Sequence, residues 1–157
     1  MENNILKIIY TFFLGLLLAL FVGLGISTFY IAPTAPEYTY STSSDKPQTD
    51  PAYRTYNEQS KRYEEDKITY NRNVSMIALA SAVMLLIISF GLEKRNKIIA
   101  NGVLLGGLFT LLYSIGRGFA SQDSKYTFIV VSIGLAIVLY LGYRRFSDHP
   151  EKKKGKE

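Results

Sequence analysis

The sequence predicts an all-α integral membrane protein, a bundle of four transmembrane helices, from three observations. Four apolar stretches make up more than half of the 157 residues, at 5–31, 74–92, 98–115 and 126–143. No charged residue lies in the middle of any of them. Each is close to the ~20 residues, with ~17 tolerated, that a helix needs to cross a hydrocarbon core ~30 Å thick. The polar residues are concentrated instead in one block and in short segments between the apolar stretches.

The first apolar stretch is expected to be a retained helix rather than a cleaved signal peptide. Its apolar run of about 25 residues far exceeds the ~7–15 residues of a signal sequence. Pro33 and Pro36 then break the helix, because proline lacks a backbone N–H and restricts the residue before it. Residues 1–31 are therefore assigned to a cytoplasmic N-terminus and the first helix, and 32–73 to a segment outside the membrane.

A second helix is expected to begin in this outer segment and to continue into the membrane. Asp50 followed by Pro51 is typical of a helix start, with aspartate as N-cap and proline at the first helical position. No glycine and no further proline occurs before residue 74. The second transmembrane helix, 74–92, is thus predicted to extend outward as a long, charged helix with a stripe of tyrosines.

The remaining segments follow from the positions of the apolar stretches. The expected order is a cytoplasmic turn at 93–97, the third helix at 98–115, an outer turn at 116–125, the fourth helix at 126–143 and a basic tail at 144–157. The outer turn contains Gly116 and Gly118, and glycine is common in turns.

Charge predicts the orientation of the chain in the membrane. The N-terminus, the 93–97 turn and the tail together carry ten basic and five acidic residues, whereas the outer segments carry eight of each. Basic residues in short segments near the span ends favour the cytoplasm. We expect both termini to be cytoplasmic, in a plasma (inner) membrane.

Small residues recur every fourth position in the first and third helices. The first helix carries Gly15, Ala19 and Gly23 in such a ridge, and the third begins its ridge with Gly102 and Gly106, followed by Thr and Ser. Membrane helices associate where small residues let their backbones approach. The ridges are interpreted as helix-packing surfaces, either within one chain or between copies; a ridge without a special role is the third possibility.

Four tyrosines follow one side of the outer helix: Tyr53, Tyr56, Tyr63 and Tyr70. Their spacing of three and seven resembles an a/d register. One interpretation is an internal aromatic patch, with the stripe packed on the chain's own Phe29, Tyr30, Tyr38 and Tyr40. The other is a partner surface, since tyrosine is enriched at interaction hot spots. A stacking platform for sugars or nucleic acid is a third interpretation, supported only by the aromatic rings of these tyrosines. No nucleic-acid partner is expected.

The tail is expected to meet lipid headgroups. Its basic residues are Arg144, Arg145, Lys152, Lys153 and Lys154, with Lys156 beyond them. Each such residue near an acidic leaflet contributes ~1 kcal/mol of attraction. Control of topology is the simpler role of the same charges.

Several kinds of chemistry lack the residues that they need. The chain has one histidine, in the tail, and no cysteine. No metal, cofactor or catalytic residue is therefore predicted, and no enzyme activity. Arg117, at the outer boundary of the third helix, is expected to be structural, as a cation that reaches the interface.

These observations favour a non-catalytic membrane protein. We expect a structural, assembly or accessory subunit that presents the outer helix to a partner protein or to its own copy. The alternative is an oligomeric passive channel or small transporter, whose lumen would have to use the Thr and Ser positions of the two ridges.

Overall fold

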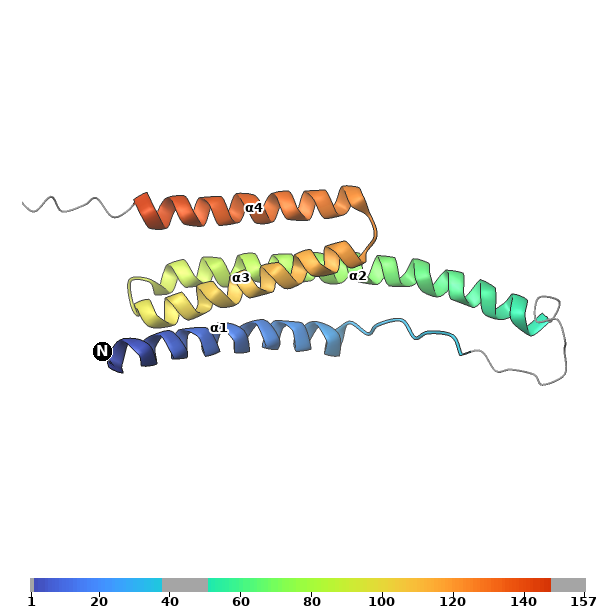
Figure 1. Cartoon of the computed structure of the whole chain (residues 1–157), viewed down its shortest axis with the longest axis horizontal. Coiled ribbons are helices and arrows are strands. Elements are labelled where there is room, and N and C mark those ends of the chain that lie inside the picture. Colours follow the sequence, from blue (N-terminus) through green and yellow to red (C-terminus); the bar gives the residue numbers. More distant parts are fainter. Residues whose placement is uncertain (1, 38–50, 148–157) are drawn as a thin grey trace, which may run out of the picture.

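The chain is folded into four long helices, as the computed structural model in Figure 1 shows. The structure describes residues 2–37 and 51–147. Its helices are α1 (Glu2–Phe29), α2 (Pro51–Leu92), α3 (Lys97–Ala120) and α4 (Ser124–Ser147). Each is long and apolar enough to cross a membrane. The prediction of an all-helical membrane protein with four spanning helices is confirmed at this level.

The central helix is α3, which contacts α1, α2 and α4. Helices α1 and α3 run in the same direction, and α2 and α4 run in the opposite one (Figure 1). One end of the bundle therefore holds the starts of α1 and α3, and we call it the Asn96 end. The other, called the Arg117 end, is where α2 extends past the other three helices (Figure 1).

Side-chain caps begin two of the helices. The Asn96 Oδ1 accepts hydrogen bonds from the N–H groups of Ile98 and Ile99, at 3.0 and 3.3 Å. The Asp123 Oδ1 does the same for α4, accepting from the N–H groups of Lys125 and Tyr126 at 3.1 Å. These are donors that the first turn of a helix leaves without intrahelical partners.

The turn between α3 and α4 is shorter than the glycines of the sequence suggested. Gly116 and Gly118 both lie inside α3, and the chain reverses between Ser121 and Asp123. The left-handed backbone conformation falls on Gln122, with φ of 54°. Gly118 is buried at a helix contact, where a Cβ would lie 3.4 Å from the Ser75 hydroxyl.

The backbones of α1 and α3 make their closest approach at two glycines. A Cβ placed on Gly106 would lie 2.9 Å from the Cβ of Leu18 and 3.2 Å from the carbonyl oxygen of Gly15. A Cβ on Gly15 would lie 2.9 Å from the Cβ of Leu105 and 3.1 Å from the Gly106 nitrogen. Neither position has room for a methyl group unless the two backbones move apart.

The interface of α2 with α3 is a seam of small residues spaced seven apart on each helix. Ser75, Ala82 and Ser89 of α2 face, in reverse order along the chain, Ser114, Gly107 and Ala100 of α3. The hydroxyls of Ser75 and Ser114 each donate to the other's backbone carbonyl at 2.8 Å. The Ser89 hydroxyl donates to the Ala100 carbonyl, also at 2.8 Å. Such bonds add ~0.6–1.7 kcal/mol each in membrane proteins.

The small-residue ridge of α1 does not stay on one face of the helix. Each step of four residues turns by about 40° beyond a full turn, since a helix has 3.6 residues per turn. Gly15 and Ala19 are buried and half-buried, but no atom lies within 4 Å of where a Cβ on Gly23 would be. At that level the inward face of α1 instead carries Val22 and Ile26.

The ridge of α3 divides between two neighbours for the same reason. Gly102 and Gly106 face α1, and the nearest atom to a Cβ on Gly102 would be the Cδ2 of Leu14 at 2.6 Å. Two turns later, Ser114 and Gly118 face α2 through Ser75. The small residues of α3 thus allow close packing against α1 on one side and against α2 on the other.

Helix α4 contacts α3 through a narrow strip of residues near the Arg117 end. Val130 is buried, and Gly134 lets the Cδ1 of Ile115 approach to 3.2 Å of where its Cβ would be. The Thr127 hydroxyl donates to the Gly118 carbonyl at 2.9 Å. Much of the rest of α4 is exposed and apolar, which suits contact with lipid.

Gly106→Ala should lower the free energy of unfolding by about 1–3 kcal/mol, because the added methyl group collides with backbone atoms. Gly23→Ala, the matched control on open helix surface, should leave it unchanged or slightly raised. Titration of the detergent-solubilised protein with sodium dodecyl sulfate, followed by circular dichroism, measures both. Equal effects of the two substitutions would contradict the close approach of α1 and α3.

Candidate functional site

An arginine lies among neutral polar and aromatic side chains at the point where α2 leaves the bundle. Arg117 of α3 is half-buried. Its Nη1 donates to the Asn71 Oδ1 at 2.9 Å, and its Nε donates to the Tyr113 hydroxyl at 3.1 Å. The guanidinium carbon also lies 5.7 Å from the centre of the Tyr70 ring and 5.4 Å from that of Tyr113. Both distances suit a cation–π interaction.

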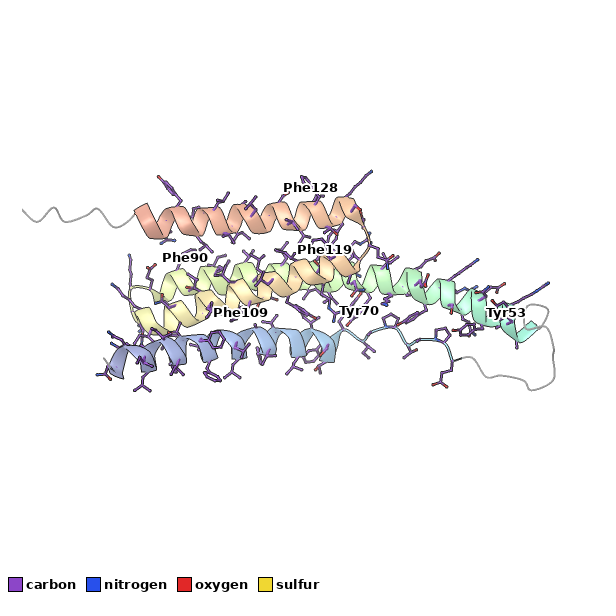
Figure 2. The ribbon with its side chains drawn as sticks, in the orientation of Figure 1. Tyr53, Tyr70, Phe90, Phe109, Phe119 and Phe128 are labelled. Carbon is purple, nitrogen blue, oxygen red and sulfur yellow. The ribbon has the colours of Figure 1, made fainter. Side chains whose placement is uncertain are left out.

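Two stacked tyrosines join the end of α1 to the same place on α2. The rings of Tyr30 and Tyr70 are 5.2 Å apart between centres and nearly parallel, at 10°. The Tyr70 hydroxyl donates to the Tyr30 carbonyl at 3.4 Å, and the Asn73 amide donates to the Tyr30 hydroxyl at 2.8 Å. Tyr70 is labelled in Figure 2, where α1 ends beside α2.

Further hydrogen bonds reach the end of α3 and the start of α4. Asn71 is 2% exposed, and its amide nitrogen donates to the Ala120 carbonyl at 3.3 Å. The Tyr126 hydroxyl donates to the Arg72 carbonyl at 3.1 Å. We call Tyr30, Tyr70, Asn71, Asn73, Tyr113 and Arg117 the Arg117 cluster. All four helices have a contact at or next to it.

The Arg117 cluster is built for positioning rather than for proton transfer. The partners that the structure gives to the guanidinium are an amide, a phenol and two aromatic faces, all neutral. A planar guanidinium can use several donors at once in such a setting, which an ammonium cannot. Among the described residues, no group of three or more His, Cys, Asp or Glu is placed to hold a metal ion.

The tyrosine stripe ends in this cluster. Tyr70 is buried, while Tyr53, Tyr56 and Tyr63 are half-buried along the part of α2 beyond the bundle. The ammonium of Lys67 lies 5.9 Å from the centre of the Tyr63 ring. Figure 2 labels Tyr53 near the far end of this part of α2.

Of the aromatic residues that an internal patch would use, the structure places two. Tyr30 stacks on Tyr70, whereas Phe29 is 91% exposed. Tyr38 and Tyr40 lie outside the described residues. The stacking of Tyr30 on Tyr70 is thus an internal contact at the inner end of the stripe.

The basic residues expected at lipid headgroups are described only in part. The guanidinium carbon of Arg144 lies 4.1 Å from the centre of the Phe90 ring, which joins the end of α4 to the end of α2. Arg145 lies in the same helix. Lys152, Lys153 and Lys154 lie outside the described residues.

The sequence offered weak signals for the Arg117 cluster. Tyr113 precedes Arg117 by four residues, so both lie on one face of α3. Asn71 and Asn73 flank the point where α2 becomes apolar. The contacts of Asn71 with Arg117 and of Asn73 with Tyr30 join positions more than forty residues apart, which helix periodicity alone does not predict.

Arg117→Ala should lower the free energy of unfolding by about 1–3 kcal/mol, since it leaves the buried Asn71 amide without one of its partners. Arg117→Lys should restore less than half of this loss, because an ammonium cannot reproduce the two planar donors. Tyr113→Phe, which removes one hydroxyl, should cost less than Arg117→Ala. Full rescue by lysine, in the same detergent titration, would show that charge alone matters here.

No known protein family matches this sequence, and no curated protein or solved structure matches the chain either.

Proposed function

We propose that this chain is a non-catalytic membrane subunit, with a structural, assembly or accessory role, that presents part of α2 to a partner protein outside the membrane. The observation that carries this proposal is the length of α2, which runs for 42 residues without interruption. About 20 residues are enough to cross a bilayer. Residues 51–70, which we call the docking segment, are the surplus at the Arg117 end.

The surface of the docking segment suits a helix that stands in water. Every charged residue of this segment is exposed: Arg54, Glu58, Lys61, Arg62, Glu64, Glu65, Asp66 and Lys67. The tyrosine stripe is its one aromatic side. An aromatic side of this kind is typical of a surface that packs against another protein. Tyrosine provides a large contact area at a low cost in side-chain entropy.

The tyrosines divide into an anchor and a contact surface under this proposal. Tyr70 is the anchor, because its ring is stacked on Tyr30 and is 9% exposed. Tyr53, Tyr56 and Tyr63 remain half-exposed, so they form the contact surface. Tyr70 thus has a structural role, and the other three tyrosines have a binding role.

The Arg117 cluster supports the proposal by fixing the base of the docking segment. The hydrogen bonds of Arg117 and Asn73 tie α2 to α3 and to the end of α1. A helix held in one direction loses less conformational freedom when it binds. Preorganisation of this kind raises affinity without new contacts.

The orientation follows from the distribution of charge. The Asn96 end carries Lys7, Lys94, Arg95 and Lys97, and α4 ends there with Arg144 and Arg145 in its last turns. Because positive residues in short segments stay in the cytoplasm, we assign the Asn96 end to the cytoplasmic side of a plasma (inner) membrane. Both termini are then cytoplasmic, and the docking segment is outside.

An oligomeric channel or small transporter has less support. Its lumen would need the polar residues of the α3 ridge, but Thr110 and Ser114 are 1% and 0% exposed. The Ser114 hydroxyl already donates a hydrogen bond to the Ser75 carbonyl across the α2–α3 seam. To line a pore with these groups, two helices would have to separate.

Tyr56→Ala combined with Tyr63→Ala should weaken capture of the partner at least about tenfold, since tyrosines at interface hot spots contribute ≥2 kcal/mol. The measurement is extraction of the tagged chain from its native membrane in mild detergent, with the mass and stoichiometry of the purified complex. Binding should then be repeated with the identified partner in purified form.

Lys61→Ala combined with Glu65→Ala is the matched control, as it removes two exposed residues from the opposite face without changing net charge. It should leave capture within about twofold of the wild type. Loss of capture by this control alone would move the contact to the charged face. A homo-oligomer without any other protein would contradict the proposal of a separate partner, and a monomer alone would overturn it.

A further inference from the structure

A shallow, open cavity of about 330 Å³ lies on the surface at the Asn96 end, where the starts of α1 and α3 meet, and its α1 side chains are exposed. Its lining includes Asn3, Leu6, Lys7 and Tyr10 of α1, with Asn96 and Ile99 across from them. The spacing of three and four residues puts the α1 members on one face of that helix. Neither the docking segment nor the Arg117 cluster contributes to this cavity, which is at the other end of the bundle.

The polar part of the cavity offers donors and a positive charge. Lys7 supplies an ammonium, and no aspartate or glutamate is among the lining residues. The Asn96 Oδ1 is already used to cap α3, so the hydrogen-bonding capacity that remains on this side chain is its amide nitrogen, a donor. An anion is therefore the occupant that matches the polar groups.

The other part of the cavity is apolar. Leu6 is 63% exposed, and Ile99 faces the cavity from the first turn of α3. Lys7 is followed directly by the apolar run of α1, so the cavity lies where the membrane-spanning part of the helix begins. A small soluble anion would gain nothing from these walls, whereas a lipid would cover them with the first methylene groups of its chains.

We propose that this cavity binds the headgroup of an acidic phospholipid from the leaflet at the Asn96 end. The phosphate lies at the Lys7 ammonium and the Asn96 amide, and the acyl chains begin along Leu6 and Ile99. The sign of the surrounding charge agrees, because the basic residues Lys7, Lys94, Arg95 and Lys97 outnumber the acids Glu2 and Glu93 at this end. A lipid held here would join the starts of α1 and α3.

The test measures lipid binding to the purified full-length chain alone, so it does not depend on any partner protein. Native mass spectrometry in a neutral detergent would count bound phosphatidylglycerol and, separately, phosphatidylcholine. The wild-type chain should prefer phosphatidylglycerol. Lys7→Gln should reduce that preference about fivefold, as expected for one basic residue at an acidic headgroup.

Lys97→Gln is the matched control, because it removes the same charge at the same end from a residue that does not line the cavity. It should keep the preference within about twofold, because an exposed residue outside the cavity has no contact with the bound headgroup to lose. Equal losses for the two variants would overturn the proposal in favour of general attraction by the whole basic end. A wild-type chain without preference for phosphatidylglycerol would overturn it directly.

A second arm separates a lipid site from a site for free phosphate. Inorganic phosphate added in excess over the lipid should leave phosphatidylglycerol bound, because the apolar contacts are absent from the competitor. Displacement of the lipid by inorganic phosphate would show a simple anion site and contradict the proposed role of Leu6 and Ile99.

Discussion

The fold depends on how closely three backbones approach at α3. Lipid tails are as apolar as leucine, so helices in a bilayer gain little by burying bulky apolar side chains against each other. Helices in a bilayer therefore associate through van der Waals packing and hydrogen bonds, both of which require a close approach of the backbones. Gly106 provides this toward α1, and Gly107 with Ser114 provides it toward α2. Helix α3 can be central because its two faces are both lined with small residues.

This packing has a consequence at the Arg117 end. Since α1 and α2 both lie against α3, the end of α1 is brought to the level of Tyr70 in α2, where Tyr30 stacks on its ring. Arg117 completes the junction through Asn71 and Tyr113. The direction in which α2 leaves the bundle is thus determined by contacts in the bundle. A helix fixed in this way can present one side to a partner, as the proposed function requires.

The sequence predicted the large features and missed those that need knowledge of neighbours. Uninterrupted apolar runs predicted four spanning helices, because the bilayer imposes the same minimum length on each. Of the ridge residues, Gly15 and Gly106 lie at the contact between α1 and α3, whereas the four-residue step drifts around the helix and carries Gly23 away from α3. The seam between Ser75 and Ser114 has a spacing of seven, visible only once α2 and α3 are known to pair. Asn71 and Arg117 meet across 46 positions of sequence, which no local pattern indicates.

The central claim is that α2 is one helix that passes from water into the bilayer without a break. The chain has no cysteine, so single spin labels can be placed along residues 52–92 one at a time. Their accessibility to a water-soluble nickel reagent and to oxygen should be measured in lipid vesicles. The account predicts a continuous period of 3.6 residues, with access to nickel over 52–70 changing to access to oxygen in the apolar part. A loss of that period near residues 70–74, or oxygen access throughout 52–70, would contradict it.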